Sequence, residues 1–321
     1  MVFDGVEKEV TIPGEYELSA TLTVPLGANE PLPAVVIVPG TGSADRDGNL
    51  KNFEINLYKN LAKFITSLGF VTIRYDKRGI GKSEGSILTC GMNDLVDDVI
   101  SNVKYAQQLP NVDSERVILL GHSEGCILNT LAYHRHRVAG LLLIAGAGAG
   151  LKSALIYQNE LAFQEIQHMN GLKGKLLKLL IKEKSIVKKQ NKLFELVQSS
   201  TEDIIKIQFR KFPAKWLREH LQVSDEHVLE LLKQADCPIL VLNGDKDVQA
   251  DLKHMENIEA FGKENIKCRI IEKMNHILRE HNEKLSLLYV KKQYKKQMQS
   301  PLHPELLQEI EGWLSSIFLR K

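Results

Sequence analysis

The sequence predicts an α/β protein with a mostly parallel central sheet and helices on both of its faces. Short apolar runs recur along the chain, segments of helical period separate them, and one long stretch interrupts the alternation. At 321 residues the chain is long enough to form one large core with an insertion. Its residues are 43% hydrophobic and 26% charged, which is typical of a globular protein and not of a disordered or fibrous one.

The predicted elements begin with a hairpin, because residues 9–24 alternate apolar and polar side chains around the turn signal Pro13-Gly14. We expect this hairpin to flank the main sheet. Six apolar runs then have the composition of buried parallel strands: Ala34–Val38, Phe70–Arg74, Arg116–Leu120, Gly140–Ala145, Pro238–Leu242 and Ile266–Ile271. Segments of helical period accompany them: Asn52–Leu68, Asn93–Leu109, Gly125–His136, Asp251–Phe261 and Pro304–Leu319. Right-handed crossovers would place these helices on both faces of the sheet, with ligands beyond the carboxyl ends of the strands.

Residues 150–222 interrupt this order, since they lack a strand pattern and repeat leucine, lysine and glutamine at helical spacing. We expect a helical cap here, inserted into a catalytic core formed by residues 1–149 and 223–321. Residues 151–220 contain 14 Lys or Arg against 7 Asp or Glu, a local charge of +7. We interpret this charge as a solvated helix surface; the alternative is attraction of anionic substrates or of an acidic surface. The basic run Lys291–Lys296 is expected to be a surface loop or helix.

Other classes of protein are disfavoured by the bulk properties. The net charge of +2 is too small for a nucleic-acid binder, and no apolar run reaches the length of a membrane span, so we expect no nucleic acid and no stable membrane insertion. The four cysteines lie far apart, without metal-ligand spacing, which indicates reduced thiols. Residues 1–10 show no export signal, and we therefore expect a cytoplasmic location.

The strongest chemical motif is Gly121-His122-Ser123-Glu124-Gly125, which matches the G-x-S-x-G nucleophile elbow. The elbow needs a strand directly before it and a helix directly after it, and the predicted run Arg116–Leu120 and helix Gly125–His136 meet that requirement. A serine hydroxyl is a weak nucleophile at neutral pH and needs a general base. We predict that Ser123 is the nucleophile.

The base and the orienting acid are predicted from chain order. In such a fold the histidine follows the last strand, and the acid follows the strand before it. His276 comes after the run Ile266–Ile271 and is the predicted base, with His281 as the reserve candidate. Asp245 and Asp247 share the loop after Pro238–Leu242; we favour Asp247 because it lies deeper in the loop, and we expect the other aspartate to cap a turn.

The oxyanion hole is predicted at two backbone amides. Pro39-Gly40-Thr41-Gly42-Ser43 follows the first parallel strand, where such enzymes supply one N–H, and we expect Thr41 to donate there. The second donor is expected to be the N–H of Glu124, because helix starts leave amides unpaired. The Glu124 carboxylate is interpreted as favourable to the helix dipole, with tuning of His276 or contact with a cationic substrate as alternatives.

Together these motifs resemble the α/β-hydrolase superfamily over nearly the whole chain. The resemblance depends on PGTGSADRDG (39–48), RYDKRGIGKSEG (74–85), GHSEG (121–125), NGDKD (243–247) and MNH (274–276). Within the superfamily the segments 45–48 and 74–79 look like bacterial carboxylesterases, which are similar to serine aminopeptidase-like and dienelactone hydrolase-like enzymes. For Asp76-Lys77-Arg78-Gly79 we expect a scaffold role, in which ion pairs lock neighbouring loops.

The resemblance implies a carboxylic-ester hydrolase that works by acyl transfer through Ser123. The expected partner is a small-molecule ester, no metal or organic cofactor is implied, and a homodimer is left open. A serine peptidase or amidase with the same triad is the nearest alternative, and it would need the cap to recognise an amino group, for example through Glu124. A more distant alternative is a binding protein that has kept the fold and lost catalytic activity.

Overall fold

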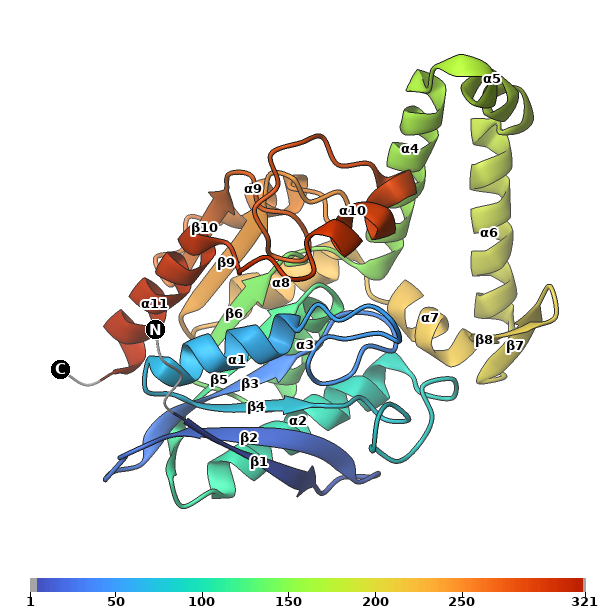
Figure 1. The fold of residues 1–321 in the computed structure, drawn as a ribbon. Helices are drawn as coiled ribbons and strands as arrows, with labels where there is room; N and C mark the ends of the chain where they lie inside the picture. Colours follow the sequence, from blue (N-terminus) through green and yellow to red (C-terminus); the bar gives the residue numbers. More distant parts are fainter. Residues whose placement is uncertain (1–4, 320–321) are drawn as a thin grey trace.

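The computed structural model describes residues 5–319 and is built around one sheet of eight strands (Figure 1). The strand order is β1-β2-β4-β3-β5-β6-β9-β10, in which β1 pairs with β2 and β2 with β4 in antiparallel fashion and all other neighbours are parallel. The strands are β1 (Gly5–Ile12), β2 (Leu18–Pro25), β3 (Leu32–Val38), β4 (Val71–Tyr75), β5 (Val112–His122), β6 (Gly140–Ile144), β9 (Ile239–Gly244) and β10 (Ile266–Ile271). The predicted fold class and the flanking hairpin are confirmed.

Helices cover both faces of this sheet, as predicted. Apolar residues of α1 (Leu57–Ser67) and α11 (Pro304–Phe318) form one core cluster with the sheet. The opposite cluster includes residues of α2 (Met92–Gln108), α3 (Glu124–Arg135), α8 (Asp225–Gln234) and α9 (Lys253–Glu259). Successive strand side chains alternate between the two clusters, so a parallel strand buried on both faces must be apolar at every position.

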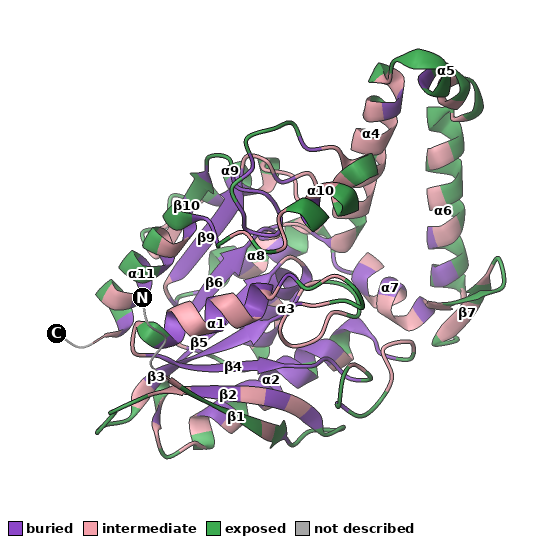
Figure 2. Ribbon diagram, viewed as in Figure 1, coloured by how far each residue is buried: buried purple, intermediate pink, exposed green. Residues whose placement is uncertain are grey.

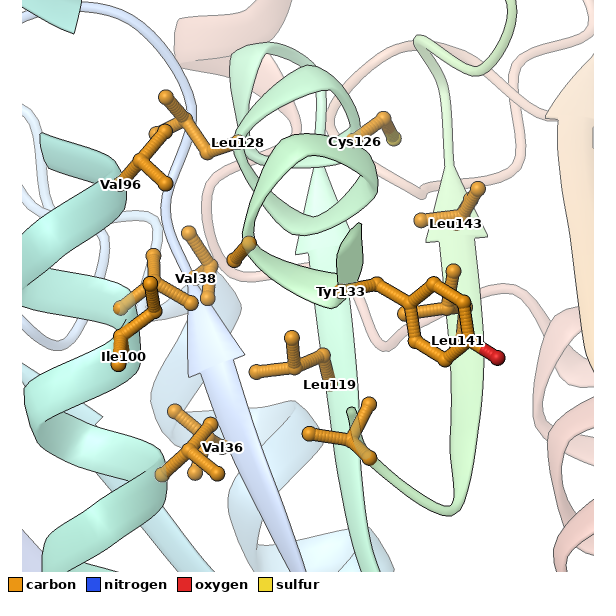
Figure 3. Close-up of a cluster of buried hydrophobic side chains, with 14 of the residues drawn as sticks. Val36, Val38, Val96, Ile100, Leu119, Cys126, Leu128, Tyr133, Leu141 and Leu143 are labelled. Carbon is orange, nitrogen blue, oxygen red and sulfur yellow. The ribbon is translucent and has the colours of Figure 1, made fainter. Parts of the chain in front are cut away.

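A close view of one core cluster shows how α3, the helix that follows Ser123, is held. Val38 and Leu119 of the sheet lie next to α3, and Val96 of α2 packs beside Leu128 of α3 (Figure 3). All four side chains are buried. Burial of each such side chain contributes about 1.5–3 kcal/mol to folding, and the contacts prevent α3 from sliding on the sheet.

The helix bounds differ from prediction at α1, which begins at Leu57 and not at Asn52. Asn52 and Asn56 have φ of 63° and 52°, in the left-handed region that interrupts a helix. The basic run Lys291–Lys296 lies in a helix, α10 (Val290–Lys296), directly after the short helix η1 (Leu287–Tyr289). Residues 1–4 and 320–321, the ends of the expected core, lie outside the described residues.

The segment 150–222 contains four helices, of which α4, α5 and α6 rise away from the sheet (Figure 1). They are α4 (Leu151–His168), α5 (Gly171–Leu180), α6 (Glu183–Ser199) and α7 (Ala214–Leu221). The expectation of no strand here is wrong: β7 (Ile204–Ile207) and β8 (Arg210–Pro213) form an antiparallel pair. Its turn uses Gln208 and Phe209 at positive φ, where Gly or Asn is usual, and each strand has only four residues. The sequence therefore carries neither a turn signal nor a strand pattern of ordinary length.

Helix α8 is an addition to the predicted elements. Ser224 caps its start by accepting the N–H of His227 at 3.2 Å. Within the described residues 5–319, none of the helices combines the length and the apolar composition needed to cross a bilayer.

Candidate active site

Ser123 lies at the sharp corner between β5 and α3. Its φ of 56° and ψ of −119° are unusual for a residue with a side chain and cost on the order of 1–3 kcal/mol. The flanking glycines are required by close approach: a Cβ at Gly121 would lie 2.4 Å from the carbonyl oxygen of Gly125, and one at Gly125 would lie 2.4 Å from that of Val38. The Ser123 N–H donates to the Ile144 carbonyl at 2.9 Å and holds the corner against β6.

The loops after β9 and β10 bring Asp247 and His276 together. His276 Nδ1 lies 2.7 Å from Asp247 Oδ2, and both residues are buried. The other carboxylate oxygen of Asp247 accepts the N–H groups of Gln249 at 2.8 Å and Ala250 at 3.1 Å. With an ionised carboxylate as acceptor, Nδ1 must be the protonated ring nitrogen, which leaves Nε2 with a free lone pair.

The two alternative candidates, Asp245 for the acid and His281 for the base, do not contact His276 or the cavity. Asp245 accepts the backbone N–H of Lys273 and pairs with Lys246 Nζ at 2.9 Å, so it caps the turn between the two loops. His281 is buried, its backbone N–H donates to the Lys273 carbonyl at 2.7 Å, and it does not line the cavity described next.

Ser123 and His276 line one cavity of about 820 Å³. Within the described part of the chain no hydrogen bond joins the Ser123 hydroxyl to the imidazole. Such contacts are often loose before substrate binds. The cavity wall is mostly apolar and also includes Leu151 and Leu155 of α4 and Trp216 of α7. The structure therefore brings the predicted nucleophile and base to one cavity, with the predicted acid behind the base.

The loop after β3 is held in place by two buried side chains that sequence reasoning did not assign to the site. The Gly40 N–H donates to Tyr58 Oη at 2.9 Å, and Lys77 Nζ donates to the Gly40 carbonyl at 2.7 Å. In a trans peptide the C=O and the following N–H point in opposite directions, so Lys77 turns the Thr41 N–H away from itself. Among the hydrogen bonds of residues 5–319, neither the Thr41 N–H nor the Glu124 N–H has an acceptor.

His122 connects helix α1 to the loop after β10. Its Nδ1 lies 3.1 Å from Tyr58 Oη, and its Nε2 lies 2.9 Å from the backbone carbonyl of His276. A carbonyl can only accept, so Nε2 is protonated and Tyr58 donates to Nδ1. Burial and the neighbouring His276 lower the pKa of His122 to about 3, and the ring stays neutral. Because its partners come from distant segments, no local pattern could have indicated this role.

The Glu124 carboxylate is buried and does not face the cavity. It accepts Trp216 Nε1 at 2.6 Å and His220 Nε2 at 2.9 Å, and Lys77 Nζ lies 3.5 Å away. Burial alone would raise the pKa of Glu124, but the Lys77 charge and the bonds from His220 and Trp216 outweigh it and lower the pKa to about 2. The alternatives in which this carboxylate contacts a cationic substrate or His276 do not match the structure, which instead connects it to α7.

The scaffold role expected for residues 76–79 is confirmed. Asp76 accepts the Arg46 guanidinium at 2.7 Å, which joins the loop after β4 to the loop after β3. Arg78 forms a bidentate pair with Asp98 of α2, with distances of 2.7 and 2.9 Å, and both residues are buried. These pairs keep the loop after β3 and the loop after β4 in one arrangement.

The cavity wall is also basic. Four exposed lysines belong to it: Lys51, Lys291, Lys292 and Lys295. Within the described residues none of them is in an ion pair, and no Asp or Glu is part of the wall. The electrostatic potential at the mouth therefore favours anions over cations.

Comparison with known proteins shows the family. The model of the family described as "Serine aminopeptidase, S33" matches residues 51–284. The esterase EstD of Thermotoga maritima is 26% identical over 275 residues. The match covers 85% of this chain and 60% of the length of that esterase.

Solved structures share the fold at low identity. Est1E of Butyrivibrio proteoclasticus, solved with ferulic acid, has a TM-score of 0.58 and 18% identity, and the match covers 91% of this chain and 98% of that one. The α/β-hydrolase GrgF of Penicillium sp. sh18 has a TM-score of 0.60 and 16% identity, with 98% and 100% covered. An esterase of Pyrococcus furiosus, Pf2001, has a TM-score of 0.57 and 12% identity, with 98% and 94% covered. The α/β-hydrolase fold predicted from the motifs is confirmed.

Proposed function

Because the chain belongs to the serine aminopeptidase family of α/β-hydrolases, we propose that it is a serine hydrolase that cleaves carboxylic esters. In this proposal Ser123 is the nucleophile, His276 the general base and Asp247 the orienting acid. The observation that supports it best is the 2.7 Å contact of Asp247 with His276 beside a cavity that also contains the Ser123 corner. The esterases among the similar proteins point in the same direction.

The mechanism follows from the atoms that face the cavity. Ser123 Oγ attacks the ester carbonyl carbon while His276 Nε2 takes the hydroxyl proton. The N–H groups of Thr41 and Glu124, which have no acceptor among the hydrogen bonds of the described residues, donate to the negative oxygen of the tetrahedral intermediate and stabilise it. His276 then passes the proton to the leaving alcohol. In the second half of the reaction His276 takes a proton from a water molecule, whose oxygen attacks the acyl carbonyl carbon. The bond to Ser123 Oγ then breaks, and His276 returns the proton to that oxygen. Asp247 stabilises the imidazolium and remains ionised throughout.

Residues 150–222 act as a cap in this proposal. Leu151 and Leu155 of α4 and Trp216 of α7 supply apolar wall to the cavity, so the cap selects the acyl or alcohol part of the substrate. A volume of about 820 Å³ suits small to medium esters. All four cysteines are buried free thiols, consistent with a cytoplasmic location.

An aminopeptidase with the same triad is the second candidate, because the family description names that activity. Two observations disfavour it. The substrate's ammonium group would meet a wall with four lysines and no carboxylate, and Glu124 is occupied by Trp216 and His220. Initial rates on p-nitrophenyl butyrate and on aminoacyl p-nitroanilides separate the two, and we expect turnover of the ester only.

The triad is tested by labelling and by matched variants. We expect a fluorophosphonate to modify Ser123, as located by peptide mass spectrometry, and Asp247→Asn to lower kcat by about 10⁴-fold. Asp245→Asn is the control, because it removes a carboxylate from the same loop without touching His276. Equal losses in the two aspartate variants would contradict the assignment of Asp247. Absence of both labelling and turnover would favour a binding protein of the same fold.

A further inference from the structure

The helix α5 presents its apolar face to solvent. Leu172, Leu176, Leu179 and Leu180 are between 57% and 87% exposed. Their spacing of four, three and one residues places them on one side of the helix. Gly174 lies on the opposite side, where a Cβ would come within 2.4 Å of the Met169 carbonyl oxygen. In most amphipathic surface helices the apolar face packs on the core, whereas in α5 it faces solvent.

Lysines flank this stripe on both sides. Around the helix Lys173 falls on one edge of the leucine stripe and Lys175 on the other, and Lys178 lies farther round, toward Gly174. Residues 171–180 contain no Asp or Glu. Helix α5 also lies at the end of the segment farthest from the sheet (Figure 1), and it is mostly exposed (Figure 2). An apolar stripe between lysines at a protruding tip is the pattern of a helix that lies in a membrane interface.

We propose that α5 docks reversibly on an anionic phospholipid surface, with its leucines among the acyl chains and its lysines at the phosphate groups. Charge complementarity selects this occupant. A second copy of the chain that packed by the same face would bring its lysines against these lysines, and nothing acidic on α5 could compensate. A lipid surface with phosphate groups satisfies both parts of the pattern.

The position of α5 relative to the cavity fits this proposal. Lys173 Nζ lies 3.3 Å from Tyr289 Oη in η1, which is followed directly by Val290 and Lys291 of the cavity wall. Glu165 of α4 accepts the Leu287 N–H at 2.7 Å and so holds η1 against the segment that includes α5. A docked surface would therefore be connected through η1 to one wall of the cavity. The docking itself does not depend on the proposed hydrolysis.

Co-sedimentation of the full chain with vesicles tests the proposal. We expect binding to vesicles of phosphatidylcholine with about one third phosphatidylglycerol, and little binding to phosphatidylcholine alone or at high salt. Leu172→Ser, Leu176→Ser and Leu179→Ser together should lower the partition coefficient about tenfold or more. Lys175→Gln should lower it about fivefold, and this substitution leaves the contact of Lys173 with Tyr289 intact.

The matched control is Phe209→Ser, which removes a fully exposed apolar side chain at the other end of α6. Thermal melting by circular dichroism checks that every variant is folded. Three results would overturn the proposal: equal binding to neutral and anionic vesicles, binding by the triple leucine variant equal to wild type, or an equal loss in Phe209→Ser. A lipid-free dimer in light scattering that the triple variant abolishes would also overturn it, because the face would then cover a second copy.

Discussion

The substitution Glu124→Gln removes one charge from the buried network beside the nucleophile and keeps the shape of the side chain. Glu124 has its pKa lowered from 4.5 to about 2, so the folded state binds its proton more weakly than the unfolded state does. A difference of roughly 2.5 pKa units corresponds to about 3 kcal/mol of stability at neutral pH. A second estimate of the same interaction comes from Lys77, which the variant leaves buried without a carboxylate partner; breaking a buried ion pair in this way typically costs about 3–5 kcal/mol. We therefore expect a loss of about 3 kcal/mol at pH 7.

The sign of the pH dependence makes this test specific. The folded pKa is depressed, so the stabilisation is fully present above pH 4.5 and is lost as the pH falls toward 2. The stability difference between wild type and variant should shrink to about half at pH 3. Urea denaturation followed by tryptophan fluorescence at pH 7, 4 and about 3 measures this difference, and titrations shared by both proteins cancel.

A matched control is available on α7, the helix that carries the Glu124 partners Trp216 and His220. Glu219→Gln changes a partly buried carboxylate of α7 that accepts the Asn93 N–H at 2.7 Å, and it should cost about 1 kcal/mol or less. A difference between wild type and Glu124→Gln that stays constant from pH 7 to 3 would refute the reasoning, because the charge on Glu124 would then contribute nothing. A loss no larger than that of the Glu219 control would refute it as well.

Three further predictions concern the cavity and the core. Tyr58→Phe orphans the Gly40 N–H and the Nδ1 of His122; we expect a stability loss of about 2–4 kcal/mol in urea titrations and a lower kcat, and unchanged kcat would contradict a positioning role. Lys291→Gln with Lys295→Gln should raise KM for the anionic ester p-nitrophenyl hemiglutarate and leave KM for p-nitrophenyl butyrate unchanged, and equal effects on both esters would exclude anion steering. Burial raises the pKa of all four thiols, that of Cys237 to about 11, so Ellman's reagent at pH 8 should titrate them only after denaturation.

Most of the fold was predictable because its signals are local. A strand buried on both faces needs an unbroken apolar run, and runs such as Ala34–Val38 and Gly140–Ala145 correspond closely to β3 and β6. The elbow was predictable for a similar reason, since the close approaches at Gly121 and Gly125 exclude other residues. Asp247 and His276 could be proposed from chain order, without any knowledge of their distance.

What could not be predicted depends on contacts between distant segments. Tyr58 and His122 are 64 positions apart, and Lys77 reaches residues 40 and 124 from a third segment. Each looks like an ordinary core or surface residue in its own window. The hairpin of β7 and β8 is a local element, but its local signals are weak. Its four-residue strands are half exposed, and its turn contains no glycine. Local preference was too weak there to outweigh the surrounding helical pattern.

Two helices of the 150–222 segment, α5 and α7, are attached to the rest of the molecule very differently. Trp216 and His220 of α7 donate hydrogen bonds to the Glu124 side chain, whereas the leucines of α5 are largely exposed to solvent. A chimera in which the corresponding helix of a relative replaces α5 should therefore change the surface on which the protein docks and leave its hydrolytic activity unchanged. An exchange that includes α7 would have to bring a new counterpart for Glu124 with it.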